Sequence, residues 1–334
     1  MEYRRMGRTG LKVSELCLGT MLFGSTTDEA EANRILDMSL EAGINFIDTA
    51  DAYANTESEK ILGRALKERR QEVILATKFF NPMGSGPNDS GMSRVYIMRA
   101  LEASLKRLQT DHVDIYYIHH VDVQTPLEEM LHALDDLVHE GKIRYLACSN
   151  YEAWRLATAL GTSSANELNR FECYQPQYSL VVRDIELELI PLCQYHDLGV
   201  VIWSPLAGGF LAGKYNPGDL DAGVQSESGR NLPKDYFSVH ADKILEVLLE
   251  VSKELGRSPD QVALRWALEQ PAITSSIVGP RTVAQFKKNL GAVGWQLDES
   301  ILQRLNAISN LPERYPQSFE KQMLSRRNDA VKRF

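Results

Sequence analysis

The sequence predicts a closed (β/α)8 or TIM barrel of the α/β class, and three observations support this prediction. Short apolar, β-branched runs alternate with longer amphipathic runs from Ser14 to the end of the chain, a pattern typical of repeated strand-helix units around a parallel sheet. Eight such units can be counted, and eight units with right-handed crossovers can close into a barrel. A doubly wound sheet normally carries a glycine fingerprint at its first turn, and no G-x-G-x-x-G occurs here.

The eight expected strands are apolar runs that end in polar residues. They are SELCLGTM from Ser14, NFIDTA from Asn45, EVILATKF from Glu72, VDIYYIHH from Val113, IRYLACSN from Ile143, FECYQPQY from Phe171, VVIWSPLA from Val200 and ITSSIVGP from Ile273. Segments between them, such as EANRILDMSLEAG and LEEMLHALDDLVHEG, keep apolar residues three and four apart and end in glycine. Such segments are expected to form the crossover helices.

Three additions to a minimal barrel are expected. A polar hairpin occupies Tyr3 to Val13, and a terminal helix, LDESILQRLNAIS, precedes a charged tail. The segment 208–237 is rich in Gly, Ser, Asn and Asp, which makes it the best candidate for a mobile lid. Because barrels commonly exceed the usual domain size, residues 1–334 are expected to form a single domain.

Composition excludes several classes of function. The chain is 43% hydrophobic and 25% charged, as globular proteins are, and its net charge of −8 without a basic run argues against a nucleic-acid partner. The first residues lack the apolar core of a secretory signal, and no apolar stretch approaches the about 18 residues of a membrane span, so we expect a cytoplasmic protein without a membrane partner. Four widely separated cysteines indicate buried thiols in a reducing compartment rather than metal ligands or disulfides.

Polar residues close successive strands of the expected barrel. Asp48 ends the second strand with Tyr53 in the loop after it, Lys78 lies near the end of the third, and His119 and His120 end the fourth. Ser149 and Asn150 end the fifth strand, Gln175 lies on the sixth, and Trp203 and Ser204 on the seventh. Active sites of such barrels lie at the carboxyl ends of the strands, so these side chains can converge on one point.

The residue types at this rim suit carbonyl reduction. The hydroxyl of Tyr53 can donate a proton to a carbonyl oxygen that gains negative charge during hydride delivery, but the ordinary pKa of a phenol, about 10, is too high for easy transfer. A buried ammonium at Lys78, held charged by Asp48, would stabilise the phenolate. His119 would then be a second donor that orients the substrate oxygen.

The chain resembles the aldo-keto reductase superfamily over nearly its whole length. GINFIDTADAYANTESEKILGRAL is similar to the family's Asp and Tyr segment, ATKF to its Lys segment, and VDIYYIHHVD to its His segment. IRYLACSNY, QPQYSL, WSPLAGGFLAGKY and GPRTVAQFKKN resemble its cofactor segments. The resemblance implies a catalytic tetrad of Asp48, Tyr53, Lys78 and His119, NADPH-dependent carbonyl reduction, and membership of the branch with bacterial general reductases and potassium-channel β subunits.

The same resemblance implies the residues that bind NADPH or NADP⁺. Near the nicotinamide they are Ser149, Asn150, Gln175 and Trp203; near the pyrophosphate Ser204, Leu206 and Gly208, with Lys214 and Arg230 in the flanking loop; and near the adenosine Gly279, Arg281, Gln285 and Asn289. Thr20, Met21, Asp48 and Pro205 are also expected to contact the cofactor. An arginine at the start of a helix offers bidentate donors to a 2′-phosphate, so Arg281 favours NADPH over NADH. Gly279 and Pro280 stand where better-known members carry Lys and Ser.

Structural alternatives remain for several of these residues. Asp48 and Asp51 could be turn residues, Ser149 and Asn150 could cap the following helix, Arg281 could be solvated, and Trp203 could pack in the barrel. Strand alternation is expected to turn only one of the two adjacent histidines inward. A short-chain dehydrogenase is disfavoured, because no Tyr is followed four residues later by Lys.

The substrate and the assembly state are less defined by the sequence. Six residues are expected to wall a largely apolar pocket that suits bulky hydrophobic carbonyls. They are Met21, Phe23, Phe79, Phe80, His120 and Tyr151. A second hypothesis is a nicotinamide-binding redox sensor or assembly subunit with slow turnover, and the choice between monomer and homo-oligomer stays open.

Overall fold

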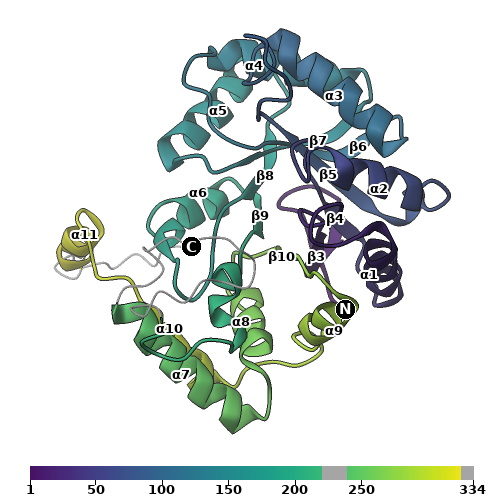
Figure 1. The fold of residues 1–334 in the computed structure, drawn as a ribbon. Coiled ribbons are helices and arrows are strands. Elements are labelled where there is room, and N and C mark those ends of the chain that lie inside the picture. Colours follow the sequence, from purple (N-terminus) through teal and green to yellow (C-terminus); the bar gives the residue numbers. More distant parts are fainter. Residues whose placement is uncertain (220–238, 325–334) are drawn as a thin grey trace.

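Eight parallel strands close into one barrel in the computed structural model, which describes residues 1–219 and 239–324 (Figure 1). Strands that follow one another along the chain are neighbours in the ring, and the last pairs with the first. They are β3 (Leu16–Gly19), β4 (Phe46–Asp48), β5 (Ile74–Phe79), β6 (Val113–Ile118), β7 (Ile143–Ser149), β8 (Phe171–Gln175), β9 (Gly199–Ile202) and β10 (Ser275–Val278). Each coincides with a predicted run to within a few residues, which confirms the TIM barrel.

Helices surround the barrel (Figure 1). They are α1 (Glu29–Glu41), α2 (Glu57–Ala65), α3 (Arg94–Leu108), α4 (Leu127–His139), α5 (Ala153–Ala165), α6 (Leu189–Tyr195), α7 (Val239–Leu255), α8 (Pro259–Leu268), α9 (Val283–Leu290), α10 (Glu299–Ser309) and α11 (Gln317–Leu324), with short 3-10 turns η1 (Arg70–Glu72), η2 (Asp184–Glu186) and η3 (Ala207–Ala212). Side chains of Asp28, Ser93 and Thr282 accept hydrogen bonds from first-turn amides and so fix the starts of α1, α3 and α9. The predicted terminal helix is α10.

One crossover differs from the predicted pattern of one helix after each strand. Two helices, α7 and α8, lie between β9 and β10. The segment 208–237, predicted as a lid, begins in described structure at η3, but its residues from 220 onward lie outside the described part of the chain. α8 contacts β10 of the barrel wall, and α7 packs on α8 and on α10. α7 and α10 therefore form an additional layer outside the barrel (Figure 1).

Strand alternation separates the barrel interior from the layer under the helices. Ala76 of β5, Ile115 and Tyr117 of β6, and Cys173 of β8 belong to an apolar cluster inside the barrel. The residues between them pack with the helices in a second, larger cluster. Since successive side chains of a strand point to opposite faces, the phase of β5 also turns Lys78 into the barrel.

The N-terminal hairpin closes one end of this interior. β1 (Tyr3–Arg5) pairs antiparallel with β2 (Lys12–Ser14), as predicted. Met6 and Val13 are fully buried and extend the interior cluster. The hairpin approaches β9 so closely that a Cβ on Gly199 would lie 2.2 Å from Sδ of Met6, so a larger residue there would require the buried Met6 side chain to move.

The predicted burial of the cysteines is confirmed. Cys17, Cys148, Cys173 and Cys193 are free thiols and all four are buried. Burial raises the pKa of each thiol, which keeps it protonated and unreactive. Among the described residues, none of the helices combines the length and apolar character that crossing a bilayer requires.

Candidate active site

A buried ion pair lies at the carboxyl end of the barrel interior. Asp48 is the last residue of β4, Lys78 is the fifth of the six residues of β5, and both side chains are almost fully enclosed. Nζ of Lys78 donates to Oδ1 of Asp48 and, over 3.0 Å, to the carbonyl oxygen of Thr49. Burial lowers the pKa of Lys78, but the charge and hydrogen bond of Asp48, together with those of Tyr53, outweigh burial and raise it. The amine is therefore a fixed cation, and Asp48 is no turn residue.

The phenol of Tyr53 contacts this cation. Nζ of Lys78 lies 3.1 Å from the hydroxyl oxygen of Tyr53 and 4.9 Å from the ring centroid. Tyr53 stands just before three consecutive residues with positive φ, Ala54, Asn55 and Thr56, at 48°, 52° and 76°. Such backbone strain persists only where surrounding structure enforces it, and here it holds the phenol over the barrel mouth.

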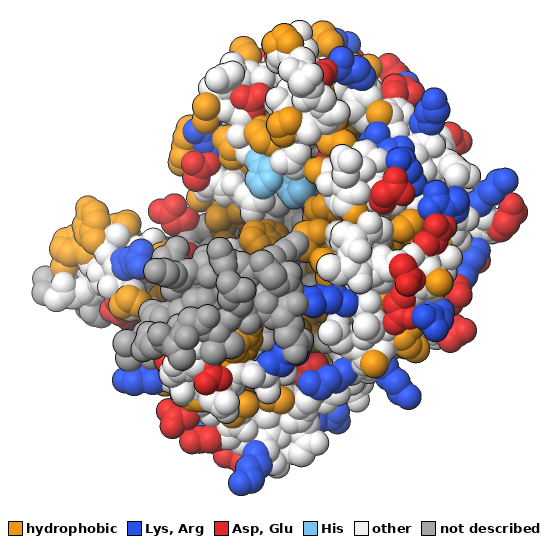
Figure 2. Space-filling view, in the orientation of Figure 1, with side chains coloured by type: hydrophobic (Ala, Val, Ile, Leu, Met, Phe, Trp, Pro, Cys, Tyr) orange, Lys and Arg blue, Asp and Glu red, His pale blue; other side chains and the backbone are white. Residues whose placement is uncertain are grey.

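Two stacked histidines complete the cluster. The ring of His119 meets that of Tyr53 edge to face at a centroid distance of 5.8 Å, and His120 stacks on His119 at 4.5 Å. Burial, with help from the charge of Lys78, lowers the pKa of His119 to about 2, so the ring is neutral at any physiological pH. In Figure 2, histidine side chains lie near the middle of the viewed face beside hydrophobic ones.

The expectation that only one of the two histidines points inward needs revision. β6 ends at Ile118, so both His119 and His120 lie in the loop after the strand, where alternation no longer applies. Their rings are nearly parallel, 8° apart, and Phe80 packs edge-on against His120. The imidazole rings of His119 and His120 therefore both border the site around Tyr53.

Asn81 is a polar neighbour that the sequence reasoning missed. Nδ2 of its side chain lies 3.3 Å from Nδ1 of His119. The available signal was its position, three residues after Lys78 at the same strand end, where polar residues gather.

Polar side chains near the ion pair form hydrogen bonds that link the ends of different strands around the barrel mouth. Nε2 of Gln175 donates to Oδ2 of Asp48 over 2.8 Å, and Oγ of Ser149 donates to the carbonyl oxygen of Gln175 over 2.7 Å. Asn150 donates through Nδ2 to the carbonyl oxygen of His119 and accepts from Nε1 of Trp203. The capping alternative is wrong for Ser149 and Asn150, because α5 begins after Glu152 and has no side-chain cap bond.

The loop after β9 turns sharply beside this rim. β9 ends at Ile202, so Trp203 and Ser204 lie beyond the strand on which they were predicted. Positive φ values recur at Ser204, Ala207, Gly208 and Gly209, from 49° to 102°. Backbone in such turns can direct several N–H groups to one point, an arrangement that binds anions.

The other residues predicted near the pyrophosphate differ in exposure. Pro205 is buried and Leu206 is half-buried in the same loop, and Lys214 is exposed further along it. Arg230 lies outside the described residues.

The residues predicted for the adenosine end gather around the start of α9. The amide of Arg281 donates to Oε1 of Gln285 over 2.9 Å, Asn289 is buried, and Gly279 is exposed next to the carbonyl oxygen of Gly19. Glu31 of α1 was not anticipated: its Oε1 accepts from the amide of Val283 over 2.7 Å and already satisfies one first-turn donor of α9.

Of the remaining residues predicted at the rim, some stay partly exposed beside the site and others are buried in the core. Thr20 is buried, and its hydroxyl donates to the carbonyl oxygen of Asp48 over 3.1 Å. The expectation that Phe79 walls the pocket is wrong, because β5 turns it away from the interior to stack on Tyr116 at 4.8 Å. Phe23 and Tyr151 are likewise buried in the layer beneath the helices, whereas Met21, Phe80 and His120 stay partly exposed.

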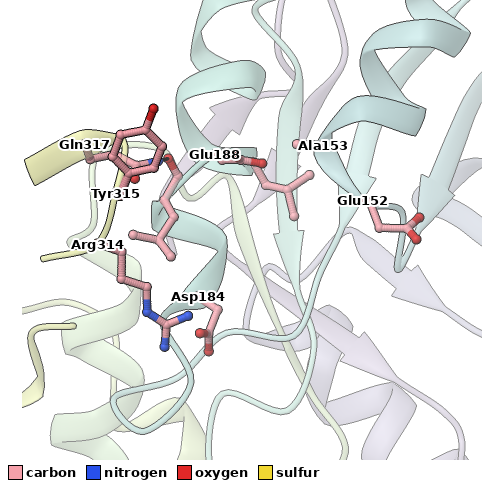
Figure 3. Close-up of a pocket in the computed structure, with 9 residues that line it drawn as sticks. Glu152, Ala153, Asp184, Glu188, Arg314, Tyr315 and Gln317 are labelled. Carbon is pink, nitrogen blue, oxygen red and sulfur yellow. Dashed lines mark hydrogen bonds between the residues drawn. The ribbon is translucent and has the colours of Figure 1, made fainter. Parts of the chain in front are cut away.

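Two cavities lie apart from the ion pair, and no residue of the predicted tetrad lines either. The first, of about 290 Å³, is lined by acidic residues and by the segment before α11, including Glu152, Asp184, Glu188, Arg314 and Tyr315 (Figure 3). The second, of about 250 Å³, lies between the loop after β6 and the start of α5.

Known proteins match this chain along most of its length. The model of the aldo/keto reductase family matches residues 15–310. The uncharacterized oxidoreductase YrpG of Bacillus subtilis is 42% identical over 320 residues, 92% of this chain and 96% of that protein. A probable voltage-gated potassium channel subunit beta of Arabidopsis thaliana is 34% identical over 96% of this chain and all of that protein, and an aldo-keto reductase of Fusarium vanettenii is 33% identical over 90% and 88%. The chain is an oxidoreductase that belongs to the aldo/keto reductase family.

Proposed function

We propose that the protein reduces aldehydes or ketones to alcohols with NADPH, and that Tyr53 donates the proton. The observation that carries the proposal is the 3.1 Å contact between the phenol of Tyr53 and the buried ammonium of Lys78. A phenolate left by proton donation gains an adjacent fixed cation, and a cation placed where charge develops is an effective catalytic device. Asp48 keeps that cation charged and oriented inside the barrel.

The residues around the cluster suit a nicotinamide cofactor, which supplies the hydride when bound. A carboxamide requires both donors and acceptors, and the hydroxyl of Ser149 and the amide of Gln175 lie beside Asp48 at the barrel mouth. The turn from Ser204 to Gly209 offers backbone amides for a pyrophosphate, and no atom of the described residues would lie within 4 Å of a Cβ at Gly209. Arg281 at the start of α9 supports a 2′-phosphate and hence NADPH, while the carboxylate of Glu31 acts against it.

The neutral charge state of the His119 ring limits the role that this residue can have. Because its pKa lies near 2, the ring cannot supply a proton as an imidazolium at neutral pH. It can donate one hydrogen bond from a ring N–H, which suits orientation of a carbonyl oxygen between the imidazole and Tyr53. Met21, Phe80 and His120 leave apolar and aromatic surface beside this point, which favours bulky hydrophobic carbonyls.

Replacement of Tyr53 tests the proposal directly. Tyr53→Phe should lower kcat for NADPH-dependent reduction by about 10²-fold or more, the range for loss of a general acid, without weakening NADPH binding measured by quenching of tryptophan fluorescence. Tyr195→Phe is the matched control, since that side chain is 85% exposed on α6. An unchanged kcat in the Tyr53 variant would refute the assigned acid.

A slow redox sensor or assembly subunit is the second candidate, favoured by the similarity to potassium channel subunits. The intact cluster of acid, amine, phenol and imidazole favours the enzyme. A panel of aldehydes, ketones and sugars with NADPH distinguishes the two: NADPH binding without turnover of any of them supports the sensor.

A further inference from the structure

The side chain of Asn81 faces one edge of the His119 ring. The amide nitrogen Nδ2 lies 3.3 Å from Nδ1 of His119. An amide N–H can only donate, so Nδ1 must accept and carries no proton in this arrangement. A neutral imidazole has one N–H, which then resides on Nε2 at the opposite side of the ring.

Both partners of this contact are held in place by other elements. The backbone carbonyl oxygen of Asn81 accepts a 2.7 Å hydrogen bond from the hydroxyl of Tyr96, which is buried on α3. The backbone of His119 donates to the carbonyl oxygen of Phe79 over 3.0 Å and accepts from Nδ2 of Asn150 over 3.0 Å. These contacts fix the backbone of both residues, and the ring of His119 is also stacked on His120.

Within residues 1–219 and 239–324, no charged group forms a hydrogen bond with Nδ1 in competition with the amide. Carboxylates hydrogen-bonded to Nδ1 are the common way to fix a histidine tautomer, and they favour the proton on Nδ1. Among the described residues, the hydrogen bond recorded at the His119 ring is the one from Asn81. The nearby cation, Lys78, is engaged by Asp48, Thr49 and Tyr53.

We propose that Asn81 is a positioning residue that keeps Nδ1 of His119 unprotonated and so holds the ring proton on Nε2, on the side from which the imidazole can donate to the substrate oxygen. The tautomer stands on geometry alone. Its use in catalysis rests on the proposed carbonyl reduction.

The tautomer can be measured without turnover. In protein with ¹⁵N-labelled histidine, the His119 signals are assigned by their loss in His119→Gln, and the shift of Nδ1 reports whether that atom carries a proton. The wild type should show an unprotonated Nδ1 and a protonated Nε2 from pH 6 to pH 9. Asn81→Asp replaces the donor by an acceptor, so Nδ1 should become protonated, whether the ring stays neutral or turns into an imidazolium. A protonated Nδ1 in the wild type, or an unprotonated one in Asn81→Asp, would overturn the proposal.

Kinetics then test the catalytic consequence. If the nitrogen shifts show a neutral ring in Asn81→Asp, its single proton lies on Nδ1 and the Nε2 donor to the developing oxyanion is lost, so kcat at pH 8 should fall by about tenfold or more. An imidazolium keeps the Nε2 donor and should leave kcat within about twofold of the wild type. In both cases the NADPH dissociation constant should change less than about twofold. Asn88→Asp, at an exposed position of the same loop, is the matched control and should change neither. An altered tautomer with unchanged kcat would remove His119 as the donor. If the wild type reduces no carbonyl at all, the proposed function fails, while the nitrogen shifts still decide the role of Asn81.

Discussion

Replacement of the buried acid Asp51 by asparagine should stabilise the protein, and the gain should grow with pH. Asp51 is fully buried, and neither carboxylate oxygen has a hydrogen-bond partner in the described part of the chain. Burial, together with the negative charge of Glu59, raises the pKa of Asp51 from 3.8 to about 7. The folded protein therefore binds a proton that the unfolded chain releases at much lower pH.

The size and sign of the effect follow from proton linkage. Between pH 4 and pH 7 the folded state holds one proton more than the unfolded state, so stability falls by about 1.4 kcal/mol per pH unit in this window and levels off above it. The interval from 3.8 to about 7 corresponds to a loss of about 4 kcal/mol. Asparagine is a neutral isostere of the protonated acid, so Asp51→Asn should avoid this loss.

Urea unfolding at pH 5 and at pH 8, followed by both circular dichroism and tryptophan fluorescence, provides the measurement. Asp51→Asn should exceed the wild type in free energy of unfolding by about 3 kcal/mol more at pH 8 than at pH 5, since the part of the window below pH 5 does not contribute to this difference. Asp298→Asn removes an exposed carboxylate and should give a curve parallel to the wild type. A gain from Asp51→Asn that is equal at both pH values would show that the carboxyl is not protonated in the folded protein.

Two further substitutions test the packing that positions the site. Lys78→Met leaves Asp48 as an unpaired buried charge and should lower the free energy of unfolding by about 3 to 5 kcal/mol, whereas addition of Asp48→Asn should restore most of it; equal losses in the single and double variants would contradict the ion-pair account. Gly63→Ala brings a Cβ to 2.2 Å from the carbonyl oxygen of Arg107, where α2 crosses α3, and should cost about 1 to 3 kcal/mol in urea unfolding. Gly161→Ala on α5 would place a Cβ with no atom of the structurally described chain within 4 Å, so it should be neutral or stabilising. Similar effects at both glycines would refute the contact at Gly63.

The barrel could be predicted because its strands are buried on both faces. Parallel strands in such a sheet leave continuous apolar runs, and the eight runs match the eight strands. Some predicted strands extended past the carboxyl ends of the observed ones. This happened where site residues follow the strand, as at His119 and Trp203. Those residues continue the aromatic and polar pattern of the run, but they leave the hydrogen-bonded ladder to face the barrel mouth.

The convergence of Asp48, Lys78 and Tyr53 also followed from the sequence, because the carboxyl ends of all eight strands share one rim. The misplacement of Phe79 was avoidable by the same principle: once Lys78 points into the barrel, the next residue must point out. Period-two alternation therefore fixes the neighbours of each site residue, as long as the strand continues. It gives no information beyond Phe79, where the strand ends.

The pattern of apolar and polar residues could not predict contacts between the loops that follow different strands. The hydrogen bonds from Asn150 to the backbone of His119 and from Trp203 to Asn150 join the ends of β6, β7 and β9, and no spacing in the sequence indicates them. They connect residues expected at the nicotinamide to the residue expected at the substrate oxygen. A change at Asn150 should therefore disturb both cofactor binding and the orientation of His119, so a loss of activity there cannot be assigned to cofactor contact alone. Asn81 contacts His119 from the other side, which makes its substitution the cleaner probe of the imidazole.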